Sequence, residues 1–112
     1  MHDRVQYFSP ENVEIAFPVS WGKSVLLDRL RLEAKEPGRY QPDKCIEQMR
    51  KLGQVYAIVC DRHFVIHAGV CVYLAAKFLK MKFVSVLIHD SDSSGTQRWL
   101  VEQLREKSRW AD

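Results

Sequence analysis

The chain has 112 residues, of which 46% are hydrophobic and 28% are charged, and its formal net charge is +3 at pH 7. This length suits one core, so we expect residues 1–112 to form a single domain. The apolar content is too high for a disordered protein. The mild positive charge allows contact with nucleic acid, but dedicated nucleic-acid binders concentrate far more lysine and arginine.

The three cysteines, Cys45, Cys60 and Cys71, form no C-x-x-C pair. Two of them lie in apolar segments, which is typical of a reducing compartment. The amino end is polar and lacks the apolar core of a signal peptide. No apolar run approaches the roughly 20 residues that span a bilayer. We therefore expect a cytoplasmic protein with no membrane partner.

The first third of the chain contains several breaks. Residues 1–12 are expected to be a flexible arm that ends in a turn. Residues 13–19 alternate apolar and other side chains, which predicts a half-buried strand, and Pro18 favours an edge position. Residues 20–24 form a turn around Gly22. Residues 25–32 fit either a short strand or a single helical turn.

A helix is predicted over residues 42–52. Pro42 suits the first helical position, and Gly53 is a natural stop after the last basic residue. The predicted apolar stripe consists of Cys45, Ile46, Met49 and Leu52.

Residues 54–88 are the most apolar part of the chain. Residues 55–60 and 64–66 are β-branched or aromatic and flank a polar turn at residues 61–63, which predicts a hairpin. Residues 68–79 change to helical spacing and carry few charges, so this helix is expected to be covered on most sides. Its apolar face would consist of Val70, Cys71, Leu74, Ala75, Phe78 and Leu79. Residues 83–88 again predict a strand.

After a loop over residues 89–94, Ser94 and Gln97 have the spacing of a capping box. The helix that follows is predicted to run to about Lys107. Its core-facing residues would be Leu100, Val101 and Leu104, with Trp99 and Trp110 covering its ends. The order of elements predicts an α+β fold with a mixed sheet.

Several local patterns resemble the ParB/sulfiredoxin-like domain, also called the ParB-like nuclease domain, over residues 26–90. They are the step Leu52-Gly53-Gln54 after a helix, the strand Phe64-Val65-Ile66, the helix opening at Gly69 with Ala75-Ala76, and the closing strand Val84-Ser85-Val86. The resemblance implies a small mixed sheet flanked by helices. It also implies an anion site at the amino end of the helix after Gly69, where free backbone amides favour phosphate.

The helix departs from the family motif in its chemistry. In the family, Gly is followed by Glu or His and then by two arginines, and here those positions hold Val70, Cys71 and Val72. The resemblance implies phosphate or nucleic-acid binding by Gly69, Val70 and Cys71, together with Arg39 at the family's early arginine and with Lys77. The loss of the motif arginines argues against catalysis. The sulfiredoxin signature Gly-Cys-His-Arg is also absent, so sulfinic acid reduction is not expected.

Two histidines offer a different site. His67 and His89 each end a predicted strand, and in this fold those ends are expected to lie close together near Gly69. With Asp90 they would supply acid–base groups or metal ligands. The alternative is that both are ordinary surface histidines. Cys71 is likewise either a nucleophile at a helix end or a small core residue.

Three function classes stay open. The first is a nucleic-acid- or nucleotide-associated binding or regulatory protein, of plasmid or phage type, with a degenerate active site. The second is a metal-dependent nuclease or nucleotide phosphohydrolase acting through His67, His89 and Asp90. The third is a protein-interaction module that has lost the ancestral site. The possible cofactors are accordingly a nucleotide or a divalent metal, and no metal ligands are assigned.

Overall fold

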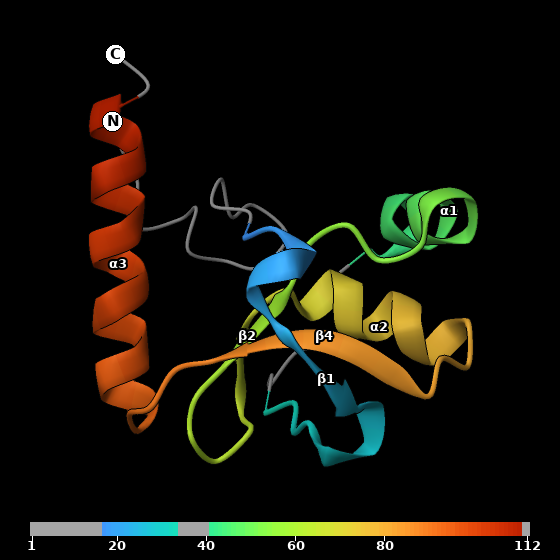
Figure 1. The fold of residues 1–112 in the computed structure, drawn as a ribbon, viewed down its shortest axis with the longest axis horizontal. Helices are drawn as coiled ribbons and strands as arrows, with labels where there is room; N and C mark the ends of the chain where they lie inside the picture. The colour runs from blue at the N-terminus through green and yellow to red at the C-terminus, as the bar shows by residue number, and fades with distance from the viewer. Residues whose placement is uncertain (1–16, 34–40, 111–112) are drawn as a thin grey trace.

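The computed structural model describes residues 17–33 and 41–110, and within the last helix the side chains of residues 104 and 107–110 are not described (Figure 1). In chain order the elements are the 3-10 helix η3 (Val19–Trp21), β1 (Lys23–Leu26), the 3-10 helix η4 (Leu27–Arg29), α1 (Asp43–Leu52), β2 (Ile58–Cys60), β3 (Ile66–Ala68), α2 (Val70–Phe78), β4 (Phe83–Ile88) and α3 (Ser93–Trp110). The α+β fold with a mixed sheet is confirmed.

The four strands form one sheet in the order β1-β4-β2-β3. β4 pairs antiparallel with β1 and parallel with β2, and β2 pairs antiparallel with β3. The parallel pair is possible because the chain returns through β3 and α2 before it enters β4. The predicted strand over residues 83–88 matches β4 in both bounds.

Each face of the sheet buries a different set of side chains. Ile58, Cys60 and Val86 belong to a core cluster that also contains buried residues of α1 and α2. Val59, one position along β2, belongs to a second cluster with Phe17 and with Leu100 of α3. This alternation follows from the pleat of a strand. Helices α1 and α2 therefore cover one face, and α3 lies against the other (Figure 1).

Helix α2 is covered on most sides, as predicted. Val70, Cys71 and Val72 are consecutive, and their exposed fractions are 2%, 8% and 9%. Three successive buried positions span most of the circumference of a helix. Phe78 was expected on the core face but is 62% exposed. That expectation was wrong because α2 ends at Phe78, at the margin of the core.

Helix α1 begins at Asp43, directly after Pro42, and its last residue is Leu52. Gly53 follows it with a φ of 75°, which only glycine adopts easily. Met49 is buried, and Cys45 and Ile46 are partly buried against the same cluster. Leu52 was expected in this stripe but is 71% exposed. It lies in the final turn, where α1 no longer faces the core.

Both alternatives for residues 25–32 occur, one after the other. The chain leaves β1, and the N–H of Leu27 donates to the carbonyl of Lys82 at 2.9 Å. The 3-10 turn η4 then redirects the backbone, and Arg31 forms a parallel bridge with Val65. The segment thus crosses from the β1 edge of the sheet to the β3 side.

The predicted strand over residues 13–19 does not continue to Val19. Pro18 forms an isolated bridge with Tyr56, but the N–H of Trp21 bonds back to the carbonyl of Pro18 at 2.9 Å, so the backbone turns there. The predicted turn over residues 20–24 is correspondingly displaced, because Ser24 already belongs to β1. Residues 1–16, which include the expected arm, lie outside the described residues.

The predicted hairpin forms, but both of its strands begin later in the chain than predicted. Residues 55–57 pair with residues 17–19 instead, through the hydrogen bond from Ala57 N–H to the carbonyl of Phe17 at 2.8 Å. Phe64 has a φ of 67° and belongs to the turn, so β3 begins at Ile66.

The side chain of Gln54 hydrogen-bonds the backbone of β4 as a neighbouring strand residue would. Its Oε1 accepts the backbone N–H of Ser85 at 2.7 Å, and its Nε2 donates to the carbonyl of Ser85 at 2.9 Å. One amide side chain thus satisfies both backbone groups of a residue inside a strand.

The predicted capping box at Ser94 is wrong. Helix α3 already begins at Ser93, and the residue that caps it is Asp92. The Oδ1 of Asp92 accepts the N–H of Gly95 at 2.9 Å, and the carbonyl of Asp92 accepts the N–H of Thr96 at 2.9 Å. Leu100 is buried and Val101 is half-buried, as expected. The helix ends at Trp110, three residues later than predicted, and the expected positions of the Leu104 and Trp110 side chains lie outside the described residues.

Among residues 17–33 and 41–110, no helix combines the length and apolar character that a membrane crossing requires.

Two glycines at helix ends provide a test of this packing. Gly69 has a φ of 89°, and a Cβ added there would lie 3.1 Å from the Cα of Ile58 in central strand β2. Gly53 has a φ of 75°, but nothing lies within 4 Å of the corresponding position. Gly53→Ala should therefore cost about 1–3 kcal/mol of unfolding free energy, the penalty of a backbone with φ of 75° and ψ of −169° that essentially only glycine adopts, with no added contact. Gly69→Ala should cost about 2–4 kcal/mol, because the contact with Ile58 is added.

Urea denaturation of the two variants measures the difference. A loss in Gly69→Ala of no more than about 1–2 kcal/mol, the penalty of its left-handed backbone alone, would contradict the close approach of Gly69 to β2.

Candidate functional site

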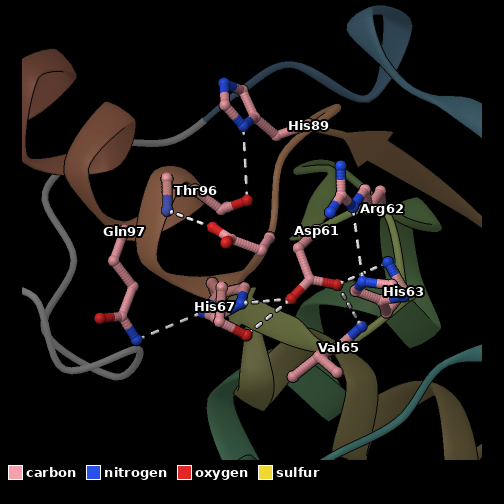
Figure 2. Close-up of polar contacts among 11 residues, drawn as sticks. Asp61, Arg62, His63, Val65, His67, His89, Thr96 and Gln97 are labelled. Atoms are coloured by element: carbon pink, nitrogen blue, oxygen red, sulfur yellow. Dashed lines mark hydrogen bonds and ion pairs between the residues drawn. The ribbon is translucent and has the colours of Figure 1, made fainter.

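The largest polar cluster is centred on Asp61, which directly follows β2 and is fully buried. Its Oδ1 accepts the backbone N–H groups of His63 at 2.8 Å and Val65 at 3.1 Å. Its Oδ2 accepts hydrogen bonds from His67 Nε2 at 2.9 Å and Ser93 Oγ at 2.9 Å (Figure 2). One carboxylate thus joins the hairpin turn, β3 and the start of α3.

The donors keep this carboxylate ionised in spite of its burial. Burial by itself raises the pKa of Asp61, because the charged form loses its water. The hydrogen bonds from His67, Ser93 and two backbone amides act in the opposite direction and lower the pKa from 3.8 to about 2. The four donors together therefore outweigh desolvation, and Asp61 carries its charge at neutral pH.

His67 faces Asp61 from β3, and only 6% of its side chain is exposed. Its bond to the carboxylate requires a proton on Nε2. In the neutral ring, Nδ1 then accepts from Gln97 Nε2, which lies 3.4 Å away on the opposite side (Figure 2). The ring is thereby held between the sheet and α3. This is the geometry of an oriented acid–base group.

His89 occupies a different environment. Its ring stacks on Trp99 with centroids 4.7 Å apart, and Trp99 stacks in turn on Phe17 at 5.5 Å. Its Nδ1 lies 3.4 Å from the hydroxyl of Thr96, which is fully buried. The rings of His67 and His89 thus contact two adjacent residues of α3, Gln97 and Thr96. Asp90, next to His89, is exposed.

The amino end of α2 lies on the opposite side of the sheet from α3. Gly69 starts the helix in the left-handed region and is half-buried, whereas the next three residues are buried. The thiol of Cys71 lies 3.9 Å from the carbonyl oxygen of Gln41. Arg39 lies outside the described residues.

Lys77 is not part of this helix end. It is exposed in the last turn of α2, with its Nζ 5.5 Å from the centroid of the Tyr73 ring. Seven residues separate it from Val70, which corresponds to about 10 Å along a helix axis. The predicted phosphate-binding residues therefore divide between the two ends of α2.

Sequence reasoning missed Asp61 and Ser93. Asp61 stood in a polar turn, and its position directly after an apolar strand was the available signal, since Asp side chains commonly accept backbone N–H groups two residues on. Nothing in the sequence connects Ser93 to Asp61. Cys45 was placed in an apolar stripe, yet a hydrogen bond from Cys71 lowers the pKa of its thiol to about 7, against the smaller opposing effect of burial.

In the described part of the chain, no three or more His, Cys, Asp and Glu side chains are arranged to hold a metal ion. The Asp61–His67 pair supplies two such groups, and both are already bonded to each other.

Solved structures identify the fold. A Pnob8-like ParB-N domain superposes with a TM-score of 0.60 and 21% sequence identity, over 73% of this chain and 34% of that chain. The chain has the ParB-N fold. The truncated chromosome-partitioning protein ParB from Caulobacter crescentus, complexed with CTP-γ-S, is similar at a TM-score of 0.60 and 15% identity, over 73% of this chain and 51% of that chain.

No family model matches the sequence. No curated protein matches it either. The likeness covers about a third of the Pnob8-like chain and about half of the Caulobacter crescentus chain. It therefore describes a ParB-like domain rather than a whole partitioning protein.

The buried carboxylate predicts a specific acid response. The pKa of Asp61 is about 2 in the folded chain and 3.8 ordinarily, so its contribution to stability is complete above roughly pH 5 and is lost as the pH falls to about 2. A difference of one in pKa corresponds to about 1.4 kcal/mol, so this contribution is about 2 kcal/mol. Asp61→Asn should lose about 2–4 kcal/mol at pH 7, because an amide leaves donors unpaired, and should show a shallower acid slope.

Urea denaturation at a series of pH values measures both effects. Asp90→Asn is the matched control, because this exposed carboxylate should change stability by no more than about 0.5 kcal/mol. Identical acid slopes in the wild type and Asp61→Asn would rule out this role for Asp61.

Proposed function

We propose that this ParB-like domain binds a nucleotide or nucleic acid by a phosphate group at the amino end of α2, without hydrolysing it. The observation that carries the proposal is the left-handed Gly69 opening α2, in a fold whose relative from Caulobacter crescentus was solved with CTP-γ-S. The first amides of a helix have no partner within the helix, and the helix dipole favours an anion there.

The side chains at this helix end support binding over chemistry. Val70 and Val72 are apolar and buried, so they provide neither a proton donor nor an arginine fork for a developing charge. Recognition would depend on backbone amides and on Arg39 from the neighbouring segment. Lys77, at the other end of α2, is suited to a more distant phosphate of a nucleic-acid backbone. Such a protein would act as a regulator of plasmid or phage type.

A hydrolytic function is the second candidate, because the oriented Asp61–His67 pair is an acid–base arrangement. In that case His67, His89 and Asp90 would act with a divalent metal on a nucleotide or nucleic acid. Metal-dependent plasmid cleavage that disappears in His67→Ala would support it, whereas cleavage that survives in His67→Ala would exclude this site.

A thermal-shift series against CTP, ATP, GTP and UTP with Mg²⁺ tests the binding proposal. At 100 times its Kd, a ligand stabilises the fold by about 2.7 kcal/mol, which is roughly 10 °C for a domain of this size. We expect at least one nucleotide to give such a shift, and Arg39→Ala to reduce it. Arg105→Ala, an exposed arginine of α3, is the matched control and should retain the full shift.

Retention of the protein on DNA tests whether it binds nucleic acid rather than a free nucleotide. Binding should weaken steeply as salt rises, and Arg39→Ala should weaken it further, because phosphate contacts release counterions. If no nucleotide shifts the transition and no DNA is retained at low salt, the proposal fails. A protein partner that co-purifies at high salt without nucleic acid would instead favour an interaction module.

A further inference from the structure

The outer edge of β1 carries backbone groups that no described strand pairs. Strand β1 is the outermost strand on its side of the sheet, and it crosses in front of β4 in Figure 1. In an antiparallel pair, successive residues turn their N–H and C=O groups alternately toward the partner strand and away from it. Ser85 of β4 shows which residues do which, because Gln54 bonds both of its backbone groups on the β2 side.

The two residues of β1 that face outward are Ser24 and Leu26. Ser24 lies opposite Ser85, whose backbone groups are turned toward β2, so these two residues exchange no backbone hydrogen bonds. The N–H of Leu27 donates to the carbonyl of Lys82, which fits the same alternation at the other end of the strand. The N–H and C=O groups of Ser24 and Leu26 therefore point away from β4.

Exposed apolar side chains lie beside this edge. Leu26 and its cross-strand partner Phe83 are 40% and 51% exposed. They belong to the α3 face of the sheet, because Val84 and Val86 alternate with them and pack on the α1 and α2 side. The cluster beneath α3 includes Leu87, near the far end of β4 from Phe83. The described residues thus leave this part of the sheet face uncovered.

The two ends of the β1 edge carry opposite charges. Lys23 begins β1, Asp28 follows two residues after its last residue, and both are exposed. Charges of this kind usually protect a strand edge from pairing with foreign strands. A second β1 running in the opposite direction, however, brings a carboxylate to the lysine and a lysine to the carboxylate. This complementarity favours a second copy of the chain over an unrelated peptide.

We propose that the outer edge of β1 pairs with the same edge of a second copy about a two-fold axis. Val25 of each copy lies at the axis, and Ser24 of each copy faces Leu26 of the other, so that both pairs exchange backbone hydrogen bonds. The two Leu26 side chains become diagonal neighbours, within reach of each other. Lys23 of each copy lies beside Asp28 of the other.

The pairing would join two four-stranded sheets into one continuous sheet. Because the two-fold axis is perpendicular to that sheet, α1 and α2 of both copies lie on the same face. The two helix ends that open at Gly69 would then lie on one side of the dimer. The inference itself concerns β1, and it stands whether or not a phosphate binds at those helix ends.

Sedimentation and amide hydrogen exchange of the full chain test the pairing. The interface is small, so the chain should be monomeric at low micromolar concentration and approach twice the monomer mass at millimolar concentration. Amide exchange of Ser24 and Leu26 should slow about tenfold when about nine-tenths of the chains are paired, because exchange then occurs from the remaining tenth. The amides of Lys23 and Val25, which already face β4, should exchange at a rate independent of concentration.

Charge reversal tests the two-fold register. Lys23→Glu and Asp28→Lys should each weaken dimerisation about tenfold at low salt, because each single change places like charges together at two symmetric positions. The double variant, Lys23→Glu with Asp28→Lys, should recover most of the affinity. Leu26→Ser should also weaken the dimer. Leu52→Ser, at a 71% exposed position in α1, is the matched control and should dimerise like the wild type.

Three results would overturn the inference. They are a wild-type chain that stays monomeric at millimolar concentration, a dimer in which the amides of Ser24 and Leu26 exchange as fast as in the monomer, and a double variant that dimerises no better than the single ones. Each variant is first compared with the wild type by circular dichroism, and the exchange experiment on the wild type needs no variant.

Discussion

The buried carboxylate of Asp61 connects three parts of the chain through hydrogen bonds: the turn after β2, strand β3 and the start of α3. It closes the turn between β2 and β3 through two backbone amides, and it reaches His67 and Ser93 with its other oxygen. An ionised carboxylate without water is costly unless all its acceptor sites are used. The arrangement of the turn, of β3 and of the first residue of α3 is therefore set by one charge, and α3 is positioned on the sheet by a polar contact as well as by Leu100.

The fold separates two regions with different chemistry. On the α3 side, polar groups are bonded to one another and hold the helix in place. On the α1 and α2 side, the left-handed Gly69 opens a helix whose first three residues are apolar and buried. The likeness to the solved ParB-N structures concerns the fold. At the helix end after Gly69, Val70 and Val72 make the side-chain surroundings apolar.

The sequence alone predicted those helices and strands whose boundaries and spacing are set by neighbouring residues. Helix α1 is bounded by Pro42 and Gly53, β4 is an uninterrupted apolar run, and α2 has helical spacing, so all three were predicted closely. The errors at Leu52, Phe78 and the cap of α3 arise where an element ends, because exposure there depends on what lies opposite. The role of Asp61 depends on Ser93, which is 32 positions away, and no local pattern reports a partner at that distance. The ParB-like resemblance identified the fold correctly, but it grouped Lys77 with the residues after Gly69, whereas Lys77 lies in the last turn of α2.

The Gly53–Gln54 step has a consequence for recognising distant members of this fold. Gln54 replaces a strand residue by bonding both backbone groups of Ser85, which requires a side chain of this length carrying both an oxygen and an NH₂ group. Asparagine is one methylene too short, and glutamate has no donor. Its partner is a main chain, so the pairing is independent of whatever ligand the domain holds. In divergent chains we expect this dipeptide to be a more durable sequence marker than the site residues of α2, which change whenever the chemistry changes.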